Sequence, residues 1–219
     1  MQMIAPPRPR KNPMQSRSQL LVRAIEEACL RIVQKDGPSK LTTQRIADTA
    51  GVNIASVYQY FPSKEAVLAR VLEDETARLA EEARSRFAHI EALSNTQFEA
   101  TLNAIIELEA SQLFCIHQLG EDFYLQYRQS FDIRERIKQL SLSQAEPCWE
   151  DWFPAFLRRH RQRLRSENFS ILSFITIHAL RSCLDATLAE NPELLLQPEF
   201  RDEVKTLLLR YLQADQAAG

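Results

Sequence analysis

Apolar residues recur at intervals of three and four along almost the whole chain, the spacing that places them on one face of an α-helix. The first such segment runs from about Arg17 to Asp36, where Gly37 and Pro38 stop it. No alternating pattern typical of a strand continues for more than four residues. The pattern therefore predicts an all-α fold. Further helices are expected at about 43–50, 53–61, 64–87, 95–118, 121–128, 130–146, 148–164, 168–190 and 199–213.

Prolines and charge divide the chain into three expected parts. Residues 1–16 hold four of the ten prolines, together with Arg8, Arg10 and Lys11, and predict a flexible basic arm. Residues 17–62 form a head of short helices, and residues 63–219 form a larger helical body. Ser63 is expected to cap the long helix 64–87, which would connect the two. Pro154 lies one turn inside its segment and predicts either a kink or a later helix start.

Composition excludes several other classes of protein. Four glycines in 219 residues are too few for most sheet proteins or for glycine-loop nucleotide binders. The longest uncharged run, Thr49 to Ser63, is too short to cross a bilayer, and the first thirty residues lack a secretory apolar region. Four well-separated cysteines form no C-x-x-C pair. We therefore expect a cytoplasmic, nucleoid-associated protein with reduced thiols, no membrane partner and no zinc framework.

The net charge of −2 conceals an asymmetry between the two ends of the chain. Residues 1–70 hold 11 Lys and Arg against 5 Asp and Glu, which gives +6. Residues 71–219 hold 16 against 24, which gives −8. A basic end on an acidic body indicates a polyanion-binding module, although charge also segregates for solubility alone.

Residues 43–62 (TQRIADTAGVNIASVYQYFP) have the pattern of a helix-turn-helix. Ala47 is small enough for two helices to approach closely, and Gly51 can adopt the positive φ of a sharp turn. Asn53 is a suitable N-cap for the second helix. Apolar residues at Ile46, Ala50, Val52 and Val57 would seal the inner faces of two crossed helices. The second helix would then lie in the major groove of DNA.

The outward face of this second helix would display Ile54, Ala55, Ser56, Gln59 and one edge of Tyr58 and Tyr60. These side chains are uncharged, so base discrimination would use hydrogen bonds and apolar contact with thymine methyl groups. Phosphate contacts would come from the flanks. The full set of expected DNA-binding residues is Thr42, Thr43, Gln44, Arg45, Asn53, Ile54, Ala55, Ser56, Tyr58, Gln59, Tyr60 and Lys64, with Lys40 and the arm adding charge.

The segment LTTQRIADTAGVNIASVYQYFPSKEAVLARVL resembles the signature of the TetR family of bacterial transcription regulators. The resemblance implies a three-helix DNA-binding head and a helical ligand-binding body. It also implies a homodimer on a palindromic operator, most often a repressor that a small molecule releases. By resemblance, Thr43, Tyr58, Tyr60 and Lys64 match phosphate-contacting positions. The positions that match base-facing ones are Gln44, Ile54, Ala55, Ser56 and Gln59. Ala55-Ser56 replaces a common Gly-Thr, and Ile54 stands where a polar residue is usual.

Half of the 18 aromatic residues fall between Phe114 and Phe156. Such a cluster is typical of an apolar small-molecule pocket, and equally of a plain helical core. The candidate effector-binding residues are Phe114, His117, Tyr124, Trp149 and Trp152.

Neither metal-ligand spacing nor a catalytic set of side chains is recognisable, so no metal, cofactor or enzymatic activity is expected. The arginines from Arg158 to Arg165 could touch DNA or an acidic partner, or could simply end a helix in solvent.

Two of the expected helices have more apolar surface than one chain can cover. The segment 168–190 is apolar on more than one side, and 199–213 has a broad stripe. We expect them to pair with their copies in a four-helix dimer interface. The candidate interface residues are Ile171, Phe174, Ile175, His178, Leu207 and Tyr211. A ligand in the body would then change the spacing of two heads through helix 64–87. The alternative is a DNA-binding dimer without any response to a ligand.

Overall fold

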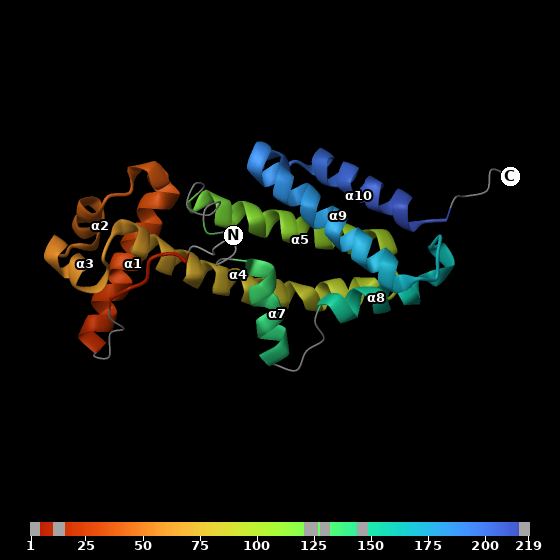
Figure 1. The fold of residues 1–219 in the computed structure, drawn as a ribbon, viewed down its shortest axis with the longest axis horizontal. Coiled ribbons are helices and arrows are strands. Elements are labelled where there is room, and N and C mark those ends of the chain that lie inside the picture. Colours follow the sequence, from red (N-terminus) through yellow and green to blue (C-terminus); the bar gives the residue numbers. More distant parts are fainter. Residues whose placement is uncertain (1–4, 11–15, 121–126, 128–131, 144–148, 215–219) are drawn as a thin grey trace. The chain divides into compact units, whose positions relative to one another are not determined.

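The computed structural model describes residues 5–10, 16–120, 127, 132–143 and 149–214, and within them it is helical (Figure 1). In these ranges no strand forms, and Leu164 and Gln213 make one isolated antiparallel bridge. The all-α prediction is confirmed. The chain divides into two compact units. One contains the residues up to Arg78 and Cys115–Ile133, and the other contains Leu79–Phe114 and the residues from Arg134 onward.

The N-terminal helices of the first unit form the head. α1 (Ser16–Asp36) packs against the short helix α2 (Thr43–Ala50), and α2 packs against α3 (Ile54–Tyr60). A 3-10 turn, η1 (Pro38–Lys40), joins α1 to α2. The head closes around fully buried apolar side chains from each helix, because each helix places its apolar stripe inward. These include Ile25, Cys29, Ile46, Ala47 and Val57.

The connecting helix α4 (Lys64–Ser94) is longer than predicted. The expected end at residue 87 was wrong because the apolar stripe continues to Ile90, which is 2% exposed, and the sequence holds no Gly or Pro there. The start agrees with the prediction. The Ser63 hydroxyl accepts a hydrogen bond from the backbone N–H of Ala66 at 3.4 Å, as an N-cap does.

The second unit holds most of the remaining helices. They are α5 (Phe98–Gln118, of which residues up to Phe114 belong here), α7 (Ile133–Ser143), α8 (Trp149–Arg159), α9 (Phe169–Glu190) and α10 (Pro198–Leu212). Two 3-10 turns join them, η2 (Arg161–Arg163) and η3 (Pro192–Leu196). The helix predicted at 121–128 lies outside the described residues. α8 runs through Pro154, so the alternative of a later helix start was wrong.

Aromatic rings fill the interior of this unit. The rings of Trp152 and Phe156 stack with centroids 5.5 Å apart, and Phe98 stacks on Phe156 at 5.2 Å. Phe87 meets Trp152 edge to face at 4.9 Å. All but Phe87 are at least 95% buried, so this part of the aromatic cluster is core packing.

The basic arm is partly fixed on the head. The backbone N–H of Arg10 donates to the carbonyl oxygen of Tyr60 at 2.7 Å, at the end of α3. The side chains of Arg8 and Arg10 are exposed. This bond holds residue 10 against the end of α3, and the flexibility of the arm as a whole stays a prediction.

By length and composition α9 could cross a membrane, although the longest uncharged run of the sequence is too short to do so. It is the single helix of this kind in the described ranges, and the buried helices of soluble proteins pass the same test.

Candidate nucleic-acid interface

Gly51 makes the turn between α2 and α3. It adopts the left-handed conformation, with φ 68° and ψ 31°, which side chains other than glycine and asparagine rarely adopt. The backbone N–H of Val52 donates to the Ala47 carbonyl oxygen at 3.0 Å, which closes the end of α2. The chain can then reverse within three residues, so that α3 crosses α2 over the buried residues Ile46, Ala47 and Val57.

Side chains cap both short helices at their starts. The Thr42 Oγ1 atom accepts from the N–H of Arg45 at 3.1 Å, and Asn53 Oδ1 accepts from the N–H of Ala55 at 2.8 Å. Each cap satisfies a backbone donor that a helix start leaves without a partner. Seven- and eight-residue helices are too short to be stable alone, so caps and the buried core define their positions. The predicted cap at Asn53 is confirmed.

The outer side of α2 and α3 carries most of the expected contact residues. Thr42, Gln44, Asn53, Ala55, Tyr58 and Gln59 are exposed, and Thr43, Arg45, Ile54, Ser56 and Lys64 are half-buried. Gln44 Nε2 donates to Asp48 Oδ1 at 2.8 Å within α2. The face of α3 is uncharged, so it could discriminate between bases through amide and hydroxyl hydrogen bonds and through contact with thymine methyl groups. The contact of these α2 and α3 residues with DNA stays a prediction.

Tyr60 lies elsewhere than predicted. Only 8% of its surface is exposed, so its ring belongs to the core of the head and not to the outward face of α3. The apolar side of a seven-residue helix needs a second large anchor beside Val57, and Tyr60 supplies it. Helical spacing separates the two tyrosines, because Tyr60 follows the buried Val57 by three residues and shares its face, whereas Tyr58 lies two positions before Tyr60 on the opposite side.

Two of the expected cationic contacts also have structural partners. The guanidinium of Arg45 pairs with the carboxylate of Asp36, at the end of α1. The ammonium of Lys64 donates to the carbonyl oxygen of Leu41 at 3.0 Å. Lys40 is exposed, and no carboxylate in the described part of the chain lies within 4.0 Å of its ammonium. Lys40 is therefore the simpler phosphate-contact candidate, although the sequence pattern favoured Lys64.

A cluster of carboxylates surrounds Arg70 where α1 meets α4. Arg70 lies 3.5 Å from Glu26, 3.2 Å from Glu73 and 3.0 Å from Asp74. Burial, and after it the charge of Asp74, raise the pKa of Glu26 to about 6 against the opposing effect of Arg70. Burial likewise raises the pKa of Asp74. One arginine therefore holds three carboxylates at the base of the head.

Two family profiles match the chain. The profile of bacterial regulatory proteins of the tetR family matches residues 25–71, which include α2, the turn and α3. The profile of the Tetracyclin repressor-like C-terminal domain matches residues 151–212. The chain belongs to the TetR family. It is therefore a transcriptional regulator with a DNA-binding helix-turn-helix, which agrees with the expectation that it is not an enzyme. No curated protein matches it closely.

Several solved structures resemble this TetR-family regulator. A TetR-family transcriptional regulator of Mesorhizobium loti is 14% identical with a TM-score of 0.54, and the match covers 91% of this chain and 100% of that one. A structure described as the molecular basis for control of antibiotic production by bacterial hormones is 17% identical with a TM-score of 0.50, covering 93% and 100%. SmeT, the repressor of the Stenotrophomonas maltophilia multidrug efflux pump SmeDEF, is 18% identical with a TM-score of 0.43, covering 92% and 93%. The first two similarities show the fold alone.

The expected effector-binding residues do not gather around one described cavity. Phe114, His117 and Trp152 are each at least 94% buried. Tyr124 lies outside the described residues, and Trp149 begins α8 with a side chain that the structure does not describe.

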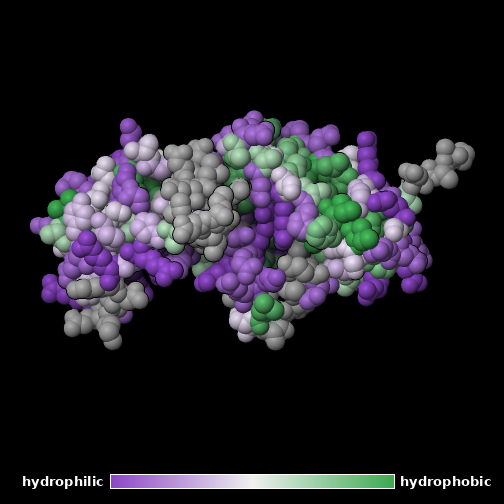
Figure 2. Space-filling model, viewed as in Figure 1, coloured by the Kyte–Doolittle hydropathy of each residue, from purple (hydrophilic) through white to green (hydrophobic). Residues whose placement is uncertain are grey.

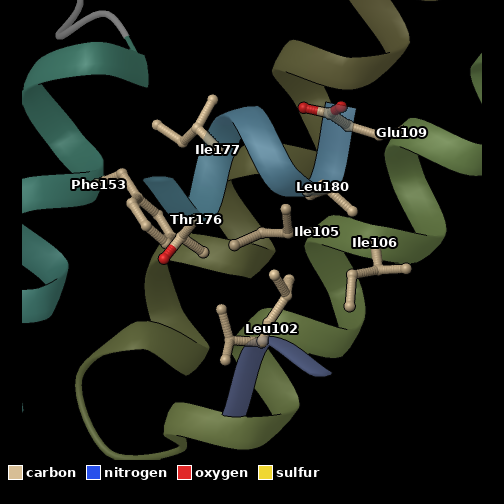
Figure 3. A pocket seen from close by; sticks show the side chains of 9 residues that line it. Leu102, Ile105, Ile106, Glu109, Phe153, Thr176, Ile177 and Leu180 are labelled. Carbon is tan, nitrogen blue, oxygen red and sulfur yellow. The ribbon is translucent and has the colours of Figure 1, made fainter. Parts of the chain in front are cut away.

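A small cavity in the second unit has a different lining. Its lining residues are Leu102, Ile105, Ile106, Glu109, Phe153, Thr176, Ile177, Leu180 and Leu208, drawn from α5, α8, α9 and α10 (Figure 3). Its volume of about 10 Å³ leaves room for no more than about one water molecule. Arg134 pairs with the lining residue Glu109 at 3.2 Å and with Asp185 of α9 at 3.3 Å. The sequence analysis used aromatic residues to predict the effector site, whereas aliphatic residues form most of the lining of this cavity.

The expected dimer residues lie on the surface. Ile171 is 55%, Phe174 64%, Ile175 40% and Leu207 56% exposed, and His178 is also exposed. Figure 2 shows this apolar surface over α9. Tyr211 is only half-exposed, and the guanidinium of Arg165 lies over its ring at 4.3 Å. Large apolar side chains in water are costly, so these positions favour a surface that a partner covers.

Proposed function

We propose that this TetR-family regulator is a homodimer that binds a palindromic operator and represses transcription until a small apolar or aromatic molecule releases it. The observation that carries the proposal is the capped α2–turn–α3 unit, with its uncharged side chains on one exposed face. In this arrangement α3 enters the major groove and α2 crosses the phosphate backbone. Two heads related by a two-fold axis would meet half-sites about 34–36 Å apart.

Within the head, reading and anchoring belong to different side chains. Gln59, Ser56 and Ile54 would discriminate base pairs from α3, with Gln44 from α2 beside them. Thr43, Tyr58 and Lys40 would contact phosphates, together with the arginines of the arm. Thr42 and Asn53 contribute chiefly as caps, since their side-chain oxygens already accept backbone hydrogen bonds.

The decisive experiment selects bound duplexes from a random DNA library with the purified protein. The expected product is a sequence with two inverted half-sites, bound far more tightly than random duplex at physiological salt. Gln59→Ala should bind with a relaxed preference at one position of each half-site. Gln34→Ala is the matched control, because Gln34 is an exposed glutamine on α1 outside the α2–α3 face. Enrichment of no sequence by the wild-type protein would reject the proposal.

The cavity in the body favours a second candidate, a dimeric regulator that does not respond to a ligand. Room for one water molecule is far below the volume of a drug-sized ligand site. A ligand would have to part α5 from α9 and displace Arg134 from Glu109 or Asp185. A screen of apolar and aromatic compounds for thermal stabilisation and for release from the selected operator separates the candidates. Release by any compound supports the repressor, and stability unchanged throughout supports the second candidate.

We also propose a location in the cytoplasm, at the nucleoid, since the operator is there. The partners are then duplex DNA, a second copy and an effector, with no membrane. The exposed apolar face of α9 would be covered by the second copy.

A further inference from the structure

The exposed face of α9 changes in side-chain size halfway along the helix. The exposed positions spaced by three or four residues are Ile171, Phe174, Ile175, His178, Ser182, Ala186 and Ala189. The first four are large and the last three are small. Phe174 and His178 rest against each other, with ring centroids 4.2 Å apart. One half of the stripe therefore projects from the helix, and the other half is recessed.

Only one orientation of two copies fills such a surface. In a parallel pair, large side chains would meet large ones and the recessed halves would leave a void. In an antiparallel pair centred near residue 180, the projecting half of each copy lies in the recessed half of the other. Ile171 then faces Ala189 of the partner subunit, and His178 faces Ser182 of the partner subunit. Packed interfaces need this complementarity, because voids and overlaps both weaken association.

The two ends of the α9–α10 pair carry opposite charge. The arginine cluster (Arg158, Arg159, Arg161, Arg163 and Arg165) directly precedes α9. Arg158 lies over the Phe169 ring at 5.8 Å, and Arg165 donates to the Tyr211 carbonyl oxygen at the end of α10. Among the described residues, no carboxylate lies within 4.0 Å of any of the five guanidinium groups. Within the described residues, an acidic body thus leaves its densest basic cluster without an ion-pair partner.

The opposite end is acidic. Glu190 ends α9, Glu193 lies in η3, and Glu199 and Glu203 lie on the first half of α10. All four are exposed, and no Lys or Arg nitrogen in the described part of the chain comes within 4.0 Å of their carboxylates. Arg210 is exposed on the last turn of α10, one helical turn beyond the exposed Leu207. Both helices therefore run between an acidic end and a basic end.

We infer that the second copy of this chain docks antiparallel on α9 with its centre near residue 180, so that the arginine cluster of each copy faces the acidic end of the other. The inference rests on the proposed homodimer and adds its register and its charged ends. Shape and charge select the same orientation independently. The arginine cluster is then part of the dimer surface, and the alternatives of a DNA contact or an unused helix end become outcomes of the test.

A size exchange between two positions tests the register. Residues 171 and 189 lie five turns and about 27 Å apart on one helix, so they cannot touch within one chain. Ala189→Phe should weaken dimerisation about tenfold or more, because the new ring overlaps Ile171 of the partner subunit. The double variant Ile171→Ala/Ala189→Phe should recover to within about threefold of wild type. Sedimentation at a series of concentrations measures each dissociation constant.

Leu142→Ala/Ala189→Phe is the matched control. Leu142 is 60% exposed on α7, so its truncation removes a similar apolar group at a position outside the proposed interface. This pair should stay as weak as Ala189→Phe alone. If the wild-type protein dimerises but neither double variant recovers, the register is wrong and the homodimer stands. A wild-type protein that stays monomeric overturns both the register and the proposed homodimer.

Cysteine cross-linking reports the same register without disturbing packing. In a background that carries Cys115→Ser and Cys183→Ser, which removes the exposed and the half-buried native thiols, oxidised Ile171→Cys/Ala189→Cys should migrate as a covalent dimer. Each single variant in the same background should stay monomeric under denaturing conditions. Cross-linking of the single Ile171→Cys protein would instead support a parallel pair and overturn the inference.

Charge reversal tests whether the arginine cluster of one copy faces the acidic end of the other. Arg161→Glu/Arg163→Glu mixed with Glu190→Arg/Glu193→Arg should give more heterodimer than the statistical half, by native mass spectrometry. A statistical mixture, or loss of DNA affinity by the arginine variant with unchanged dimerisation, would assign the arginine cluster another role.

Discussion

Single residues determine the conformation of the head at two kinds of position, the turn and the charged base. Gly51 has φ 68°, and a Cβ atom added there would meet no atom within 4 Å. The need for glycine is therefore conformational and not a matter of space. At the base of the head, by contrast, the free energy of unfolding depends on the charge of the carboxylates that pair with Arg70.

Gly51→Ala should destabilise the protein by about 1 kcal/mol, the cost of placing an L-residue in the left-handed region. Gly51→Asn should cost less, because asparagine tolerates this conformation. Urea unfolding followed by circular dichroism measures both. Equal stability of the alanine variant and the wild type would contradict a strained turn.

Glu26 should make the head less stable as pH rises. Its pKa is raised to about 6 in the folded protein from an ordinary value of 4.5, so the folded state binds the proton more tightly. Stability is then fully present below about 4.5 and is lost as pH rises through about 6. Glu26→Gln should therefore gain about 1 kcal/mol over wild type at pH 8, since residual solvent contact screens part of the shift.

The gain of Glu26→Gln should vanish at pH 4.5, where the wild-type carboxyl is already protonated in the folded state. Urea unfolding at the two pH values measures it. Glu27→Gln is the control, because Glu27 is an exposed neighbour on the same helix. A gain of equal size at both pH values would show that charge is not its cause.

At the scale of elements, the sequence predicted the helices of the head almost to the residue. The capping residue Asn53 and the turn at Gly51 are strong local signals, and each has the predicted geometry. Two of the errors came from local signals that the prediction did not use: the apolar stripe of α4 continues past residue 87 to Ile90, and Tyr60 follows the buried Val57 by three residues. Other features depend on long-range packing, which local signals do not encode. The hydrogen bond of Lys64 to Leu41 joins residues 23 positions apart.

The division between reading and anchoring belongs to α3 and its flanks. Gln59→Ala should lose about 1–3 kcal/mol of discrimination at one base position, whereas Lys40→Ala should weaken all sequences and lower the salt slope by about 1. Titrations of operator and random duplex at several salt concentrations measure both. Lys40 is preferred to Lys64 for this test, since Lys64→Ala would also remove the bond to Leu41. Equal loss on both duplexes by both variants would contradict the division.

At the scale of the whole molecule, the sequence indicated a head, a body and a dimer, but it could not locate an effector site. Aromatic composition was ambiguous because rings such as Trp152 and Phe156 serve equally well as core, and here they stack on each other. The aliphatic cavity combines residues from four helices, a combination that no short segment encodes. The apolar surface of α9, in contrast, could be predicted from the sequence. A helix that is apolar on more than one side has more apolar surface than its own chain can bury.

If an effector binds the body, its binding and operator binding must oppose each other by the same factor, since coupling free energy is reciprocal. A compound that weakens operator affinity by between about 5- and 150-fold should bind the operator complex that much more weakly than the free dimer. Calorimetric titration of the compound into free protein, operator complex and a mixture with scrambled duplex measures the factor. The scrambled duplex should leave ligand affinity unchanged, because the coupling requires both half-sites to be occupied. Equal affinity for free protein and operator complex would reject release by linkage and favour the regulator that has no effector.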